Sequence, residues 1–223
     1  MKEFAMLGWH PMYGEVILEV LKETFGAVEI ALFLNIEIQN KEPFNIPADI
    51  LTIHPPAGSG LADRPCCFGT AGPWNKQLIF EDFMRSHGWQ PNDYLRVIHP
   101  SSYVAGSATI EPGCLIEPIC TISTAAHIGF GTTIKRGSHI GHHNRIGAWC
   151  DINPGVILSG ACVIGDGTTL GSGTVVRDGV NIGKGCFIGM GSVVTKDIPD
   201  GMMAFGNPCK IQKPFQKGRL EHL

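Results

Sequence analysis

The sequence lacks any apolar run near the roughly 18 residues that a membrane-spanning helix needs. Its amino terminus also lacks the basic-then-apolar order of a secretory signal peptide. Strong charge is absent too, since the formal net charge is −3 and the pI is about 6.3. No general attraction to nucleic acid or to an anionic membrane follows from such a balance. We therefore expect a cytoplasmic protein that binds neither nucleic acid nor membranes.

What the chain does contain is an unbroken six-residue period. Every sixth residue from Ile110 to Val194 is Ile, Leu or Val. Neither a helix, with a period near 3.6, nor a strand, with a period of 2, explains this spacing. Hexapeptide repeats are typical of a parallel β-helix, in which three short faces make one coil. At about 18 residues per coil, we predict about five coils from Val104 to about Ile198.

The eight cysteines do not have the spacing of metal ligands. Five of them lie two residues before a repeat aliphatic: Cys114, Cys120, Cys150, Cys162 and Cys186. The same slot otherwise holds mostly small residues such as Ala, Ser, Thr and Val. Cysteine behaves as a small buried hydrophobe in such places, so we assign these five to packing.

Residues 1–98 do not follow the six-residue period. Short apolar runs predict strands at 4–7, 28–34, 49–53, 66–68 and 94–98. One helical stripe predicts a helix that follows Gly14 and ends at Gly26, and a second helix is predicted at 75–87. Strands that alternate with helices indicate a small parallel α/β domain, Rossmann-like in kind. We therefore divide the chain into an α/β domain (1–98), a β-helix (99–199) and a tail (200–223).

Four histidines of the repeat region raise the hypothesis of a metal site: His127, His139, His142 and His143. Residues in adjacent coils are separated by 18 positions, which sets His142 near Thr124 and Gly160. No second histidine or carboxylate then completes three ligands within one chain. We expect no metal site within one chain. A site completed by ligands from a neighbouring subunit remains an alternative. His142 should face outward, either as a solvated side chain or as a general base.

Three stretches of the chain carry a family resemblance. They are His99-Pro100-Ser101, the run HIGHHNRIGAWCDINPGVILSG and the run VVTKDIPDGMMAFGNPCKI. Together they resemble the sialic acid O-acetyltransferase type of hexapeptide acyltransferase. That group includes the N-acetyltransferases that act on UDP-4-amino sugars, such as those making bacillosamine. The resemblance covers residue 99 to about 211 and extends loosely into residues 1–98.

The resemblance implies an acetyl-CoA-dependent acetyltransferase that is a homotrimer of left-handed β-helices, with active sites between subunits. His142 matches the base of the family, and His143 stands where the family has Asp or Glu. Asp151 stands where bacillosamine enzymes have a histidine that touches acetyl-CoA, so His143 and Asp151 could have exchanged roles. Ser172 and Met190 match two further acetyl-CoA contacts. Lys196 and Lys210 could also meet the phosphates of CoA.

The amino-terminal domain resembles the family less closely. Relatives have a glycine-rich turn after the first strand, where this chain has Gly8-Trp9-His10-Pro11-Met12-Tyr13-Gly14. Aligned from Gly14, the substrate contacts of the family fall on Pro11, Met12 and Tyr13. Asn35 stands where relatives have an Asp-Asp pair, and Gly69 matches a glycine beside the nucleotide.

The leading hypothesis is an acetyl-CoA-dependent N-acetyltransferase acting on the amino group of a nucleotide-linked amino sugar in bacterial surface-glycan synthesis. The alternative within the family is a sugar O-acetyltransferase. A metal-dependent hexapeptide protein and a non-catalytic scaffold are the alternatives from other classes.

Overall fold

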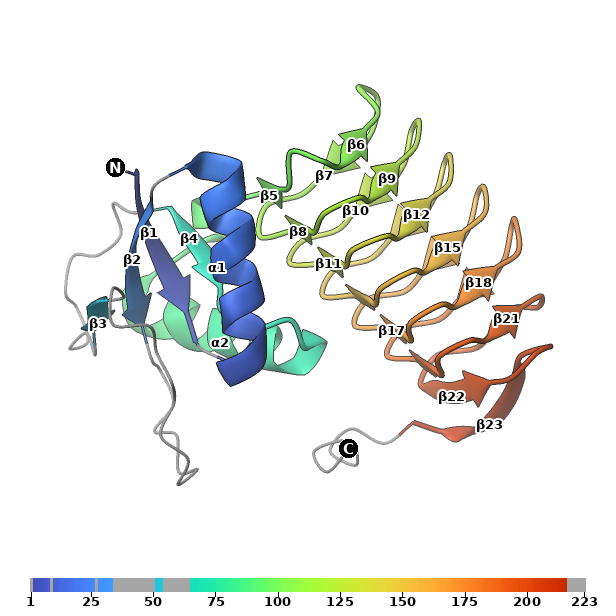
Figure 1. Cartoon of the computed structure of the whole chain (residues 1–223). Coiled ribbons are helices and arrows are strands. Elements are labelled where there is room, and N and C mark those ends of the chain that lie inside the picture. The colour runs from blue at the N-terminus through green and yellow to red at the C-terminus, as the bar shows by residue number, and fades with distance from the viewer. Residues whose placement is uncertain (1, 9, 27, 34–50, 54–64, 216–223) are drawn as a thin grey trace.

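The computed structural model describes residues 2–8, 10–26, 28–33, 51–53 and 65–215 (Figure 1). The amino-terminal part holds a parallel sheet in the order β3-β2-β1-β4. Its strands are β1 (Lys2–Leu7), β2 (Val28–Phe33), β3 (Leu51–Ile53) and β4 (Cys66–Phe68). All four occur where the sequence predicts them. The carboxyl ends of β1 and β4 point the same way, which is the edge where open parallel sheets bind ligands.

Two helices pack on this sheet, α1 (Pro11–Phe25) and α2 (Pro73–His87). The predicted stripe of α1 is buried, with Ile17, Val20 and Leu21 almost fully covered. The prediction that this helix follows Gly14 is wrong, because it begins at Pro11. Proline suits the first helical position, since its missing N–H would have no partner there. The expected turn at 8–14 is therefore a shorter turn followed by the first turn of α1.

The expected strand at 94–98 forms only at β5 (Val97–Ile98), after a short 3-10 helix η1 (Pro91–Asp93). β5 pairs with β8 of the repeat region, whereas Tyr94 makes a single bridge to Cys66. The chain thus passes directly from the α/β sheet into the first coil.

The repeat region is a parallel β-helix with three faces. The first face holds β5, β8 (Leu115–Ile116), β11 (Thr133–Ile134), β14 (Asp151–Ile152), β17 (Thr169–Leu170) and β20 (Phe187–Ile188). The second face holds β6 (Tyr103–Val104), β9 (Thr121–Ile122), β12 (His139–Ile140), β15 (Ile157–Leu158), β18 (Val175–Val176) and β21 (Val193–Val194). The third face holds β7 (Thr109–Ile110), β10 (His127–Ile128), β13 (Arg145–Ile146), β16 (Val163–Ile164) and β19 (Asn181–Ile182).

The coils stack with a constant offset of 18 residues, as in the pairs His127 with Arg145 and His139 with Ile157. The repeat aliphatics all point inward and form one continuous buried core. The first and second faces reach six coils, one more than the sequence predicts, because β5 and β6 start the stack before the aliphatic ladder does. At the far end, β22 (Met202–Phe205) continues the first face and β23 (Lys210–Pro214) pairs antiparallel to it (Figure 1).

The slot two residues before each aliphatic is buried and does more than accept small side chains. The five cysteines assigned to packing are all buried free thiols, as expected. Polar residues in the slot bridge two coils, as Thr132 does when it donates to the Gly147 carbonyl at 2.8 Å and accepts from Cys150 N–H at 2.9 Å. The Cys150 thiol likewise contacts the Gly165 carbonyl at 3.2 Å. The slot therefore satisfies a carbonyl that the turn leaves exposed inside the coil.

Aromatic rings join the α/β domain to the β-helix. Phe68 and Phe80 of the domain pack edge-on or tilted against Phe130 and Trp149 of the coils, with ring centroids 5.2 to 6.4 Å apart. Tyr94 stacks on Phe68 at 4.7 Å and links the same group. Burying several rings gives this contact a large apolar area, so it holds the domain against the first coils.

Among the described residues, no helix has the length and apolarity to span a membrane.

Removing the slot hydroxyl should destabilise the coil. We expect Thr132→Val to lower the free energy of unfolding by roughly 1–3 kcal/mol, because a buried carbonyl and a buried N–H lose their partner. Thr132→Cys should cost less, since thiols fill this slot in other coils. Thr109→Val, on the exposed outer side of β7, is the matched control. Urea unfolding measures all three variants. Equal stability of Thr132→Val and the parent would contradict the bridging role of the Thr132 hydroxyl.

Candidate functional site

His142 and His143 lie in the turn between β12 and β13, which we call the second corner because it joins the second and third faces. Both are exposed, as expected for His142. The His142 ring lies against Gly160 in the next coil, where a Cβ atom would collide with it. His143 N–H donates to the Thr124 carbonyl at 2.9 Å. The predicted stacking of His142 between Thr124 and Gly160 is thus confirmed.

The two imidazoles contact each other through their Nδ1 atoms at 3.1 Å. His143 adopts a left-handed backbone with φ of +57°, as Ala125 and Ala161 do at the same place in the neighbouring coils. If His142 Nδ1 carries the proton, it donates to His143 Nδ1 and leaves His142 Nε2 free to accept a proton. In this tautomer the neutral His143 ring accepts the Nδ1 proton of His142 and holds the orientation of the His142 ring.

Asp151 occupies a different place from the one that an exchange with His143 within one chain requires. It begins β14 on the first face, is almost fully buried, and its carboxylate contacts Lys135 Nζ at 3.0 Å. Lys135 also donates to Asn153 Oδ1 at 2.8 Å. Burial raises the pKa of Asp151, and the charge of Lys135 opposes that rise. Within one chain the Asp151 carboxylate thus pairs with Lys135, and the His143 ring pairs with His142.

Ser172 and Met190 stack in successive turns after β17 and β20, at the first corner, which joins the first and second faces. Gly191 N–H donates to the Ser172 carbonyl at 2.9 Å, and the Met190 residue is 79% exposed. The same column carries Arg136 and Pro154 in earlier coils. Lys196 and Lys210 are exposed near this end of the chain. Ser172 and Met190 therefore share one column at a corner other than that of His142, whereas Asp151 lies on the first face.

The predicted substrate-binding turn and Gly69 lie together at the carboxyl ends of β1 and β4. The backbones of Gly8 and Gly69 are so close that a Cβ atom on Gly69 would collide with the Gly8 carbonyl. His10 N–H donates to the Gly69 carbonyl at 3.0 Å. His10 also caps α1, because its Nδ1 accepts from Tyr13 N–H at 3.2 Å. The start of α1 is therefore closed by the chain itself. The side chains of Pro11 and Met12, and all of Asn35, lie outside the described residues.

Tyr13 reaches from α1 to the first face of the β-helix. Its hydroxyl donates to the carboxylate of Glu117, and its ring lies 5.1 Å from Lys135 Nζ. Burial raises the pKa of Tyr13, and the nearby charge of Glu117 raises it further. Glu117 is 0% exposed and also accepts from the backbone N–H and Nη1 of Arg136, both at 3.1 Å. Sequence inspection missed this group, although Glu117, Lys135 and Asn153 follow three repeat aliphatics at 18-residue spacing.

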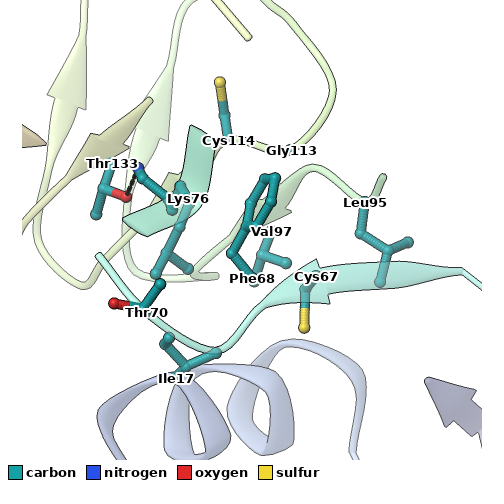
Figure 2. Close-up of a pocket in the computed structure, with 11 residues that line it drawn as sticks. Ile17, Cys67, Phe68, Thr70, Lys76, Leu95, Val97, Gly113, Cys114 and Thr133 are labelled. Atoms are coloured by element: carbon teal, nitrogen blue, oxygen red, sulfur yellow. Dashed lines mark hydrogen bonds between the residues drawn. The ribbon is translucent and has the colours of Figure 1, made fainter. Parts of the chain in front are cut away.

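Lys76 is a second buried charge that the sequence did not reveal. It lies in α2, is 1% exposed, and its Nζ donates to Thr133 Oγ1 at 2.8 Å and to the Gly131 carbonyl. Figure 2 shows it beside a cavity of about 10 Å³ whose walls include Phe68 and Cys114. Burial lowers the pKa of Lys76 to about 8, an effect that the charge of Asp151 partly opposes. In the described part of the chain, no group of three or more His, Cys, Asp or Glu is arranged to hold a metal ion.

Known proteins resemble this chain mainly in structure. Residues 161–196 match the family model described as bacterial transferase hexapeptide (six repeats). A galactoside O-acetyltransferase of Lactococcus lactis is 62% identical over 26 residues, which are 12% of this chain and only 13% of that relative. The acetyltransferase domain of PglB from Neisseria gonorrhoeae, solved with acetyl coenzyme A, superposes with a TM-score of 0.78 at 23% identity, over 95% of this chain and 99% of that one.

A further solved structure is a histidine-to-asparagine variant of perosamine N-acetyltransferase from Caulobacter crescentus, in complex with CoA and GDP-perosamine. It superposes with a TM-score of 0.76 at 24% identity, over 96% of this chain and 97% of that one. The chain has the fold of these acetyltransferases. The fold predicted from the six-residue period and from residues 99–211 is thereby confirmed, including the small α/β domain ahead of the β-helix.

The lowered pKa of Lys76 predicts a pH dependence of stability. The unfolded chain binds a proton at this lysine up to about pH 10.5, whereas the folded chain releases it near pH 8. Stability rises with pH wherever the unfolded state binds more protons. Relative to Lys76→Met, the parent should therefore gain up to about 3 kcal/mol of unfolding free energy between pH 7 and pH 10.

Urea unfolding at several pH values measures this difference. Lys22→Met is the control, because Lys22 is a largely exposed residue of α1. It should follow the parent at every pH. A parent curve that runs parallel to that of Lys76→Met would show that burial does not perturb this lysine.

Proposed function

We propose that this chain is an acetyl-CoA-dependent N-acetyltransferase that acts on the amino group of a nucleotide-linked amino sugar, in the cytoplasmic steps of bacterial surface-glycan synthesis. The observation that carries the proposal is the fold over nearly the whole chain, which matches acetyltransferases solved with acetyl coenzyme A or with CoA and GDP-perosamine. The exposed His142–His143 pair supports it by offering a base at the second corner.

The chemistry asks for a base because the acceptor amine must lose a proton. In our proposal His142 Nε2 takes this proton as the amine nitrogen attacks the thioester carbon. The C–S bond then breaks, and the protonated His142 returns the proton to the departing sulfur, so that CoA leaves as the thiol. His143 holds His142 in the tautomer with Nδ1 protonated, through the 3.1 Å contact. Backbone N–H groups at the coil turns are suited to stabilise the oxyanion of the tetrahedral intermediate.

The acetyl-CoA contacts in this proposal are Asp151, Ser172 and Met190. The exposure of Met190 and its stacking over Ser172 support a line of contacts along the first corner for these two residues, and Asp151 begins β14 on the adjoining first face. Such a line suits an extended co-substrate, since each coil offers one contact. Pro11, Met12, Tyr13, Asn35 and Gly69 are the proposed acceptor contacts, and the closeness of the Tyr13 turn to Gly69 supports grouping them.

We further propose a homotrimer with active sites between subunits. In one chain His142 stands at the second corner, whereas Ser172 and Met190 stand at the first. A neighbouring chain that turns its first corner toward the second corner of this one would bring base and acetyl-CoA together. An exchange of roles between His143 and Asp151 would then also take place between chains rather than within one.

The second candidate is sugar O-acetylation, favoured by the short match to a galactoside O-acetyltransferase. A neutral hydroxyl is a much weaker nucleophile than a neutral amine, so its attack would depend even more on proton removal by His142. A panel of nucleotide-linked amino sugars and their hydroxyl analogues, assayed with acetyl-CoA by the release of free thiol, separates the two. Turnover of the hydroxyl compounds alone would overturn the proposal of N-acetylation.

His142→Ala should lower kcat/KM for the acceptor by roughly a hundred- to ten-thousand-fold, because the proton of the amine then has no positioned acceptor. His139→Ala is the matched control, since His139 is also exposed but lies on β12 against Thr121. It should leave turnover unchanged. Thiol release measures both variants, and a His142→Ala variant as fast as the parent would remove His142 from the site.

A further inference from the structure

The start of α1 offers few free backbone N–H groups to a phosphate. Pro11 has no N–H, and the N–H groups of Tyr13 and Gly14 already bond to His10. A helix amino terminus binds an anion through free N–H groups, so this one is largely used up. A phosphate group on the acceptor would therefore have to be bound by other groups, such as a cationic side chain.

Arg136 is a cationic side chain that lies close to this turn. Its backbone N–H and Nη1 both bond to Glu117, which also bonds to the Tyr13 hydroxyl. The Arg136 side chain is nevertheless 58% exposed. Only Nη1 is used in the hydrogen bonds of the described chain, so the other edge of the guanidinium fork faces outward. A fork fixed at one edge and free at the other suits bidentate binding of phosphate oxygens.

The burial of Glu117 indicates that its hydrogen bonds to Arg136 do more than link two neighbouring coils. Glu111 makes the same kind of backbone contact, to Phe130 N–H at 2.9 Å, while its side chain is 39% exposed. A carboxylate can thus staple a turn from the surface. Glu117 is instead covered completely, and a buried carboxylate costs free energy unless it is paired. Its pairing with Arg136 and Tyr13 fixes both groups at the edge of the α/β domain.

The charges around Tyr13 also favour an anion. Three cations, Lys76, Lys135 and Arg136, surround two carboxylates, Glu117 and Asp151, in one interacting group. This leaves one positive charge in excess when all five are ionised. Asp151 pairs with Lys135 and Glu117 pairs with Arg136, so the excess charge lies on the buried Lys76. Arg136 is the exposed cation of this net positive group.

We propose that Arg136, held by Glu117, binds the phosphate groups of the acceptor beside the first turn of α1. This rests on the proposed function, which supplies a phosphate-bearing amino sugar. It makes Arg136 the residue that selects phosphorylated over neutral amino sugars, and it replaces the backbone N–H groups that His10 and Pro11 remove.

The test compares one amino sugar in three forms: nucleotide-linked, as its 1-phosphate, and unphosphorylated. We expect Arg136→Gln to raise KM roughly 10- to 100-fold for the phosphorylated forms while kcat changes little. The unphosphorylated sugar should react equally with variant and parent. Arg136→Lys should restore part of the loss, because it keeps the charge without the fork. A larger rise for the nucleotide form than for the 1-phosphate would assign the fork to a diphosphate.

Arg145→Gln is the matched control, because Arg145 is an exposed arginine on the third face. It should change none of these constants. An equal loss for all three sugars, or no loss for any, would overturn the role of Arg136.

Calorimetric titration with inorganic pyrophosphate tests the same residue without turnover. The parent and Arg145→Gln should bind it, and Arg136→Gln should bind at least tenfold more weakly. Equal binding by all three proteins, or no binding by the parent, would overturn the inference even if acetyl transfer occurs. If pyrophosphate discriminates the variants while no amino sugar is acetylated, the proposed function fails and the anion site stands.

Discussion

The constant 18-residue offset between coils is the constraint on which the rest of the structure depends. It sends every repeat aliphatic into one continuous core and sets each slot residue opposite a carbonyl of the next coil. It also fixes what can meet on the outside. His142 must lie on Gly160, and Met190 must follow Ser172, because no other neighbour exists in a stack of this register. Chemistry on this scaffold is therefore arranged in columns along its corners.

The α/β domain turns one of these columns into a possible acceptor site. Aromatic packing between Phe68, Phe130 and Trp149 holds the domain against the first coils. That contact brings Tyr13 onto Glu117 and sets Lys76 against Thr133. These polar groups are buried, so leaving any of them without a partner would cost free energy. Their pairing therefore fixes the orientation of the first turn of α1. The charged groups of the β-helix thus pair directly with the first turn of α1.

The sequence predicted the periodic part of this structure well and the contacts between its two parts poorly. The six-residue ladder determined the core, the coil register and the burial of Cys150, since each depends on local spacing. The apolar stripe of α1 is visible only after Gly14, whereas the helix begins at Pro11, because proline suits the first helical position whatever its polarity. Tyr13 and Glu117 are 104 residues apart and Lys76 and Thr133 are 57 apart. No local pattern couples such pairs, although the 18-residue spacing of Glu117 and Lys135 was visible.

In the proposed trimer, His142 of one chain serves the acetyl-CoA column of its neighbour. Coexpression of His142→Ala with Met190→Glu tests this arrangement, because each variant alone should be inactive. In randomly mixed trimers, about a quarter of the parent's activity should return, since a quarter of the sites pair an intact His142 with an intact Met190 column. Thiol release from acetyl-CoA in the presence of the amino sugar measures the activity. Mixed trimers that are as inactive as either variant alone would show instead that base and co-substrate belong to the same chain.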